Sequence, residues 1–190
     1  MVVIGLIGLI TAIAIVNFTG SPAQRLDSSL RLLHSQVSLA RQHAITHRED
    51  TVLVFPNNPA DSERFLRSFF VAAGSGTQMT NALGNWVDLP VGIHFDNDAG
   101  LEDNLFGLSA GPAITLPEYL DPPASADVLY MRFNPRGEVV TQQRVSPRLY
   151  LAVGTVTGST FSRANDDVRD LVLVRRLTGL PEIHRFDVNP

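Results

Sequence analysis

The 190-residue chain contains no cysteine and no lysine. The absence of cysteine excludes disulfides, zinc–thiolate sites, iron–sulfur clusters and a cysteine nucleophile. Because all 15 basic residues are arginine, a P-loop lysine, a Schiff base and a Ser–Lys dyad are excluded as well. The chain also lacks a basic excess, with a net charge of −4 and a pI of about 5.7, so a nucleic-acid partner is not expected.

Charge is distributed unevenly along a chain whose 44% apolar and 18% charged residues are typical of a globular protein. Residues 1–48 carry a net charge of +3, residues 49–128 carry −10, residues 129–162 carry +3, and residues 163–190 are neutral. The acidic middle and the basic N-terminal part are therefore candidates for contact, within the molecule or between neighbouring molecules.

The N-terminal segment is apolar and uncharged. No charged residue precedes Arg25, and Thr11 is the one polar residue among residues 1–16. Sixteen helical residues rise about 24 Å, slightly less than the roughly 30 Å of a bilayer's hydrocarbon core. The segment is open to three interpretations: a signal peptide without its basic start, a core helix, or a membrane helix whose first residues are absent. The side chains expected in a membrane helix are Val2, Val3, Ile4, Leu6, Ile7, Leu9, Ile10, Ile13, Ile15 and Val16.

Residues 24–47 have the periodicity of an amphipathic helix. Six apolar residues recur at intervals of four and three, which places them on one helix face that we expect to pack on a sheet. Pro22 either kinks the preceding helical stretch or occupies the first turn of this helix. The six packing residues are Leu26, Leu30, Leu33, Val37, Ala40 and Ala44.

His43 and His47 lie four residues apart, as two zinc ligands on one helix face would. The metalloprotease motif requires a glutamate directly after the first histidine, and Ala44 occupies that position. We therefore favour two solvated histidines near the C-terminus of the helix, where partial positive charge suits the helix dipole.

From Thr51 onward the pattern changes to short runs rich in β-branched and aromatic residues, separated by turn residues such as those at 74–76, 134–137 and 177–179. This pattern predicts antiparallel β-structure, so the fold class is α+β, with a long N-terminal helix packed on an antiparallel β-sheet domain. The expected organisation is a membrane helix at 1–18, an amphipathic helix at 19–48 and a β domain at 49–190 with an irregular acidic insertion at about 96–127. The seven expected strands are 51–55, 68–72, 91–95, 128–133, 149–153, 171–174 and 183–186.

Residues 1–15 (MVVIGLIGLITAIAI) resemble the start of type IV pilins and pseudopilins, just after their Phe-Thr-Leu-x-Glu opening. Residues 32–45 (LLHSQVSLARQHAI) resemble the Leu-x-x-Ala-Arg-x-x-Ala-Ile stretch of H-type pseudopilins of type II secretion and related minor pilins. Residues 133–137 (FNPRG) and 172–179 (VLVRRLTG) resemble that family's Phe-x-Pro-x-Gly turn and its closing strand and turn. The basic leader and the Phe-Thr-x-x-Glu opening do not occur in this sequence, which suggests a late start codon or a trimmed N-terminus.

The resemblance implies a pilin-like fold and a structural role rather than an enzymatic one, with no catalytic residues. The implied protein is a minor pseudopilin of a type II secretion system, anchored by a single helix in the bacterial inner membrane, with its β domain in the periplasm. Its implied partners are other pseudopilins or pilins, which bind through the N-terminal helix, and the prepilin peptidase that processes and methylates the precursor. A minor pilin of a type IV pilus and a signal-anchored binding domain or enzyme remain alternatives.

Two groups of charged residues are candidate sites. The acids near residue 100 have the density of a calcium loop, but Leu101 and Gly107 stand where an EF-hand requires Gly and Glu, so a solvated acidic turn is favoured. Arg175 and Arg176 are candidates for contact with an acidic partner, although strand alternation would send them to opposite faces. No cofactor is expected apart from this possible calcium ion, for which the candidate ligands are Asp96, Asp98, Glu102 and Asp103.

Overall fold

The computed structural model describes residues 21–107, 112–118, 128–140, 145–165 and 168–187. The membrane-helix residues proposed from the sequence, 1–18, lie outside this part. Among the described residues, no helix combines the length and the apolar composition of a membrane span.

Helix α2 (Pro22–His47) has clear start and stop signals in the sequence. Ser21 is the N-cap: its side chain accepts a hydrogen bond from the Gln24 backbone N–H, and the Gln24 side chain accepts one from the Ser21 N–H. Pro22 fills the first turn, so of its two expected roles the structure has the second. Arg48 ends the helix in the left-handed conformation, with φ 55°.

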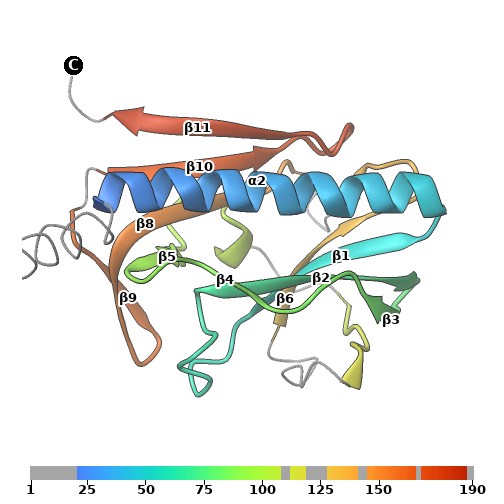
Figure 1. The fold of residues 1–190 in the computed structure, drawn as a ribbon, viewed down its shortest axis with the longest axis horizontal. Coiled ribbons are helices and arrows are strands. Elements are labelled where there is room, and N and C mark those ends of the chain that lie inside the picture. The colour runs from blue at the N-terminus through green and yellow to red at the C-terminus, as the bar shows by residue number, and fades with distance from the viewer. Residues whose placement is uncertain (1–20, 108–111, 119–127, 141–144, 166–167, 188–190) are drawn as a thin grey trace, which may run out of the picture.

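The strands form two antiparallel sheets (Figure 1). In the first sheet the order is β3-β2-β1-β6-β7, with β4 paired to β2; in the second it is β11-β10-β8-β5, with β9 paired to β8. The first sheet contains β1 (Asp50–Pro56), β2 (Ser68–Ser75), β3 (Gln78–Ala82), β4 (Val87–Asp88), β6 (Val128–Phe133) and β7 (Val139–Val140). The second contains β5 (Ile93–Phe95), β8 (Arg148–Thr157), β9 (Thr160–Arg163), β10 (Val168–Val174) and β11 (Pro181–Asp187).

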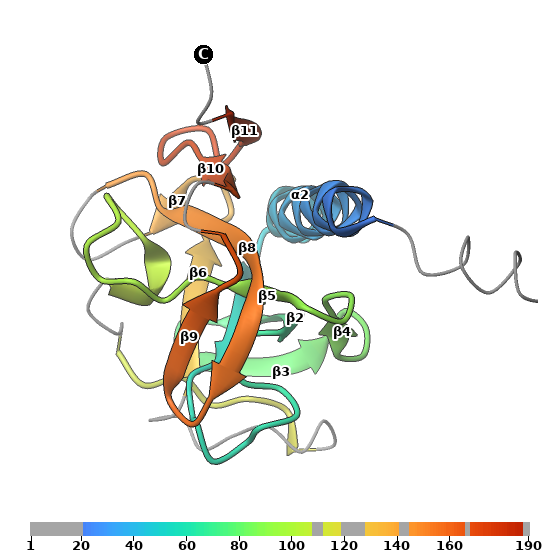
Figure 2. The ribbon, with the colours of Figure 1, turned by 90° about the vertical axis from the view of Figure 1, so that its left-hand side faces the viewer.

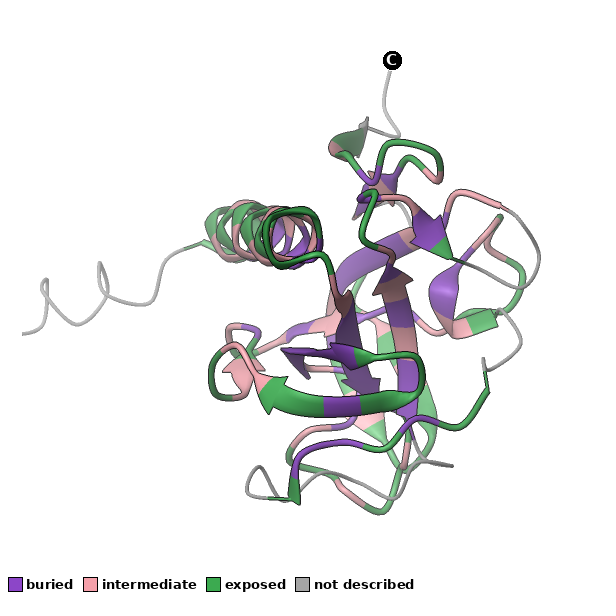
Figure 3. Ribbon diagram, turned by 90° about the vertical axis from the view of Figure 1, so that its right-hand side faces the viewer, coloured by how far each residue is buried: buried purple, intermediate pink, exposed green. Residues whose placement is uncertain are grey.

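Helix α2 covers the junction of the two sheets (Figure 2). Its buried face shares one apolar cluster with Leu53 and Phe133 of the first sheet and with Leu151 and Val172 of the second. Figure 3 shows the buried residues of α2 on the side that faces the strands. Removing this apolar surface from water is the main force that holds helix and sheets together. The α+β fold class, with a long helix on antiparallel β-structure, is therefore confirmed.

Six of the seven predicted runs lie within β1, β2, β6, β8, β10 and β11. Of the run predicted at 91–95, only Ile93–Phe95 forms a strand, β5, because residues 91 and 92 belong to the turn before it. Of the expected insertion at 96–127, residues 96–107 and 112–118 are described; they hold a short 3-10 helix (Leu105–Gly107) and no named strand. The sequence did not predict β3, β4, β7 or β9, which are only two to five residues long.

Candidate functional site

The helix face predicted to pack on a sheet is buried in the structure. Leu26, Leu30, Leu33, Val37, Ala40 and Ala44 all lie in the main core cluster. The opposite face of α2 is exposed at Ser28, Arg31, Ser35, Leu39, Gln42 and Thr46, spaced three and four residues apart. One side of the helix is therefore fixed to the β-structure while the other stays open along its length.

The candidate calcium ligands Asp96 and Asp98 bind an arginine. The Arg163 guanidinium, carried by β9, donates from Nε to Asp96 Oδ2 at 2.5 Å and from Nη2 to Asp98 Oδ2 at 2.8 Å. The Asp96 side chain is 1% exposed and that of Arg163 14%, so this is a largely buried ion pair. It lies beside an open hollow of about 480 Å³, lined by residues 96–98 and 159–163.

The electrostatics of this cluster follow from these bonds. Hydrogen bonds to Asp96 and then to Asp98 raise the pKa of the Arg163 guanidinium. The bond from Arg163, followed by the one from the Gly100 N–H, lowers the pKa of the Asp98 carboxyl. Both shifts favour the charged forms, and we call these three side chains the Asp96–Arg163 clamp (Asp96, Asp98 and Arg163).

The other two candidate ligands, Glu102 and Asp103, both contact Arg148. Glu102 Oε2 accepts a hydrogen bond from Arg148 Nη1 at 2.6 Å, and the Asp103 carbonyl accepts one from the Arg148 N–H at 2.9 Å. Across the described ranges, no group of three or more His, Asp or Glu side chains is arranged to hold a metal ion. Asp96, Asp98 and Glu102 thus pair with arginines of β8 and β9, from the C-terminal half of the chain, and no motif in the sequence indicates this pairing.

Arg175 and Arg176 lie beyond the end of β10, in the turn that leads to β11, so strand alternation does not separate them as predicted. Arg175 donates two hydrogen bonds of 2.8 Å to Glu182, which lowers the pKa of that carboxyl. The backbone of Arg176 is held by Ser146 Oγ at 3.1 Å and by the Val139 N–H at 2.8 Å. This turn is therefore fixed against β7 and β11.

The turn at 134–138, the turn between β10 and β11 and the C-terminal end of α2 lie in close contact. Gly179 (φ 64°) lies so near the 134–138 turn that a Cβ there would overlap the carbonyl oxygen of Gly137. A Cβ at Gly137 (φ 78°) would in turn overlap the Ile45 side chain. Arg41 closes the junction by donating from Nε to the Thr178 carbonyl at 2.5 Å. Both glycines belong to motifs recognised in the sequence, but their proximity is visible only in the fold.

Exposed apolar side chains surround this junction. Leu177 is 65% exposed, Leu180 49% and Ile45 39%. Three arginines accompany them, and in the described part of the chain no carboxylate forms an ion pair with any of the three. We call this surface the arginine–leucine patch; it consists of Arg41, Ile45, Arg136, Arg176, Leu177 and Leu180.

His43 and His47 stack, with their ring centroids 4.1 Å apart, at the C-terminal end of α2. His43 is less solvated than expected: its side chain is 17% exposed, and Nδ1 lies 3.4 Å from Thr51 Oγ1 and 3.6 Å from Glu49. Burial, and then the proximity of His47, lower the pKa of His43. His43 therefore connects the C-terminal end of α2 to the start of β1.

No family model and no curated protein matches this chain. Solved structures that are similar to it include the type IV minor pilin FimU of Pseudomonas aeruginosa in two crystal forms. Each has a TM-score of 0.46 and 10% identity, covering 86% and 84% of this chain and 89% and 92% of FimU. The minor pseudopilin EpsH from the Type 2 Secretion System of Vibrio cholerae has a TM-score of 0.47 and 13% identity over 86% of this chain and 97% of EpsH.

Proposed function

We propose that this chain is a structural minor pseudopilin of a type II secretion system. Residues 1–18 anchor it in the inner membrane, and residues 49–190 form a periplasmic domain joined to that anchor by residues 19–48. The observation that carries the proposal is the placement of α2, which follows the uncharged apolar segment in the sequence and is buried along one face over its whole length. A helix that is packed on the β-structure along one face connects that structure to the apolar segment before it, and so to the membrane or filament that binds this segment.

The proposed mechanism uses the same apolar segment in two surroundings. In the membrane its side chains face lipid tails; in the filament they face the corresponding helices of neighbouring subunits. Both surroundings are apolar, so transfer between them carries little hydrophobic cost, and van der Waals packing decides between them. The β domain stays outside the helical bundle and presents the surface that distinguishes this subunit from others. No step requires a catalytic group.

The test is deletion of the gene in its native host. The same strain with the full-length precursor supplied from a plasmid is the complementation control. For a pseudopilin we expect secreted proteins to accumulate in the periplasm while surface pili are unchanged. Loss of pili with normal secretion would instead establish the type IV pilus alternative. Normal secretion and normal pili, together with hydrolytic turnover by the purified protein, would refute both and favour a signal-anchored enzyme.

A matched pair of variants tests the role of the apolar segment itself. Ile10→Arg places a charge within the segment, which costs about 3 kcal/mol on membrane insertion when it lies near the bilayer centre. Ile10→Ala keeps the segment apolar. We expect Ile10→Arg to leave the membrane fraction and to lose complementation, while Ile10→Ala retains both. Equal behaviour of the two variants would contradict the anchor.

A further inference from the structure

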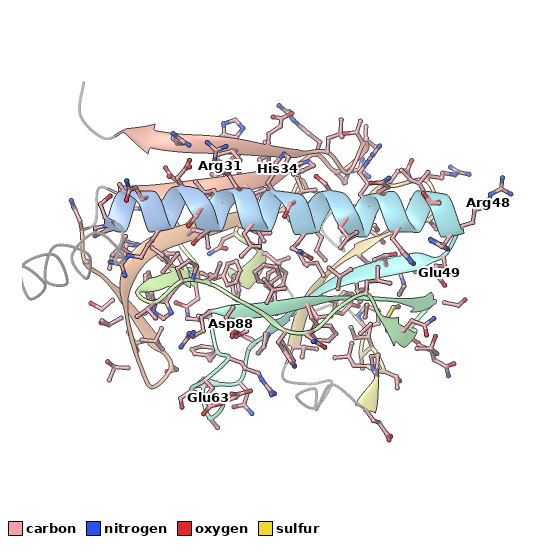
Figure 4. All side chains as sticks on the ribbon, in the orientation of Figure 1. Arg31, His34, Arg48, Glu49, Glu63 and Asp88 are labelled. Atoms are coloured by element: carbon pink, nitrogen blue, oxygen red, sulfur yellow. The ribbon has the colours of Figure 1, made fainter. Side chains whose placement is uncertain are left out.

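The arginine–leucine patch is positively charged in a chain that is negative overall. The three segments that build this end of the molecule, 41–48, 134–140 and 175–182, contain five arginines and two glutamates. Both glutamates are already engaged within the chain: Glu182 accepts from Arg175, and Glu138 accepts from the Asn134 side chain at 2.8 Å. Arg48, at the end of α2, points away from the molecule in Figure 4. The positive charge is therefore available to a partner.

Exposed apolar side chains concentrate in the same place. Large hydrophobic residues with high exposure are few in the part of the chain that the structure describes, and most of them belong to α2's last turns, β7 and the β10–β11 turn and strand. Exposed apolar groups gathered among arginines are typical of protein–protein interfaces, where apolar anchors are buried and arginine is enriched at the contact. The members in this region are Ile45, Val140, Leu177, Leu180 and Ile183.

The backbone beneath the patch is fixed before any partner arrives. The close approach of Gly137 and Gly179, and the bond from Arg41 to the Thr178 carbonyl, hold the two turns against α2. The Gly179 N–H also donates to the Arg175 carbonyl at 2.6 Å, which closes the turn that displays Leu177. A surface ordered in this way loses little conformational entropy on binding.

We propose that the arginine–leucine patch is a docking surface for an acidic surface with exposed apolar groups on a different subunit of the filament. This inference rests on the proposed function, which supplies the neighbouring subunits. Carboxylates of the partner would pair with Arg136 and Arg176, and an apolar depression would receive Leu177 and Leu180. A nucleic acid offers phosphates for the arginines but would leave the exposed leucines uncovered, so a protein partner fits the patch better.

A second copy of this chain fits the patch less well than another subunit does. The acidic middle of this chain carries the negative charge that a copy would offer. Its carboxylates at Asp96, Asp98 and Glu102 are already neutralised by Arg163 and Arg148. These three carboxylates are not available to the patch of another copy, so we assign the partner to a subunit of different sequence and keep a second copy as an outcome of the test.

The experiment is site-specific photocrosslinking in cells that make the full-length protein from the native locus. Because the chain has no cysteine, a maleimide–benzophenone reagent labels this protein only at the introduced thiol of a Leu177→Cys variant. The matched control is Ser62→Cys, also exposed but next to Glu63, on the opposite side of the molecule from α2 in Figure 4. We expect the Leu177→Cys variant, and not the control, to crosslink to another pilin-like subunit at an acidic peptide identified by mass spectrometry.

A charge-reversal variant separates docking from mere proximity. Arg136→Glu combined with Arg176→Glu is expected to reduce the crosslinked product by about tenfold or more, while the Arg→Lys pair at the same positions retains most of it. An unchanged thermal midpoint of the purified charge-reversal protein would show that the loss does not come from misfolding. Equal crosslinking by the wild-type and charge-reversed patches would overturn the proposal.

Other crosslinking and binding results would contradict the proposed partner. Crosslinking mainly to a second copy, or to a peptide without acidic residues, would contradict the proposed partner, as would binding of the purified protein to duplex DNA that charge reversal abolishes. A Leu9→Cys variant reports on the proposed function independently. If Leu9→Cys crosslinks to pilin-like subunits and Leu177→Cys does not, the docking surface is wrong and the function stands; if neither does, the function fails.

Discussion

The Asp96–Arg163 clamp and the arginine–leucine patch present arginines in two opposite ways. In the clamp, Arg163 is largely buried and is paired with Asp96 and Asp98 of its own chain. In the patch, Arg136 and Arg176 remain without a carboxylate partner among the described residues, beside a leucine that is 65% exposed. An arginine that is paired with carboxylates of its own chain contributes to the fold. An arginine without such a partner, beside exposed apolar side chains, is available for binding another protein.

The largest expected effect is the loss of the buried clamp. Arg163→Ala leaves the Asp96 carboxylate buried without its counter-charge, which typically costs about 3 to 5 kcal/mol of unfolding free energy. Urea unfolding of residues 21–190, which contain the whole described core, measures the change. The matched control is Arg175→Ala, which removes the exposed pair with Glu182 and is expected to have only a small effect. Similar losses in both variants would mean that the clamp contributes no special stability.

A smaller effect is expected where the two turns meet beneath the patch. Gly179→Ala introduces a Cβ at a positive φ that also overlaps the Gly137 carbonyl, for a cost of about 2 to 3 kcal/mol. Gly76→Ala is the control because its φ of 63° is nearly the same but its surroundings are open, so about 1 kcal/mol is expected. Equal unfolding midpoints for the two variants would contradict the close approach of the turns.

The clamp also predicts a dependence of stability on pH. Because the folded-state pKa of Asp98 is below its ordinary value of 3.8, the charged carboxylate stabilises the fold fully above that value. This contribution is lost as pH falls through the lower folded-state pKa. Asp98→Asn should therefore be less stable than wild type at pH 7, with the difference shrinking toward pH 3. Asp103→Asn, in the same loop, serves as control; an Asp98→Asn deficit that grows on acidification would disprove the assignment.

The smallest effect on stability is expected at the exposed leucine of the patch. Leu177→Ser should change the unfolding free energy by no more than about 0.5 kcal/mol, because the side chain is mostly in solvent. The same variant should impair complementation of the deletion strain if the patch binds another subunit. A large loss of stability would indicate that Leu177 supports the fold rather than a contact.

The helix and most of the sheet structure could be predicted from the sequence because their signals are local. The apolar spacing from Leu26 to Ala44 defines the buried face of α2, and the runs of β-branched and aromatic residues coincide with β1, β2, β6, β8 and β10. The short strands β3 and β9 escaped prediction because residues such as Gln78 and Ser162 carry no strand signal of their own. They are ordered by pairing with β2 and β8.

The candidate sites depended on the fold to a much greater extent. The sequence identified Asp96 and Asp98 as acids close enough to share a cation, but the cation that they bind is Arg163, more than 60 residues away. Likewise, the glycines of the two turns were recognisable as turn residues, while their contact with each other and with Arg41 was not.

The sequence alone thus determined the helix face, the strand composition and the turn positions, because periodicity and turn chemistry act over a few neighbouring residues. The tertiary structure decided which arginines are satisfied within the chain and which remain open to a partner. That outcome depends on pairing between residues far apart in the chain, where burial removes water and only the folded geometry brings opposite charges together.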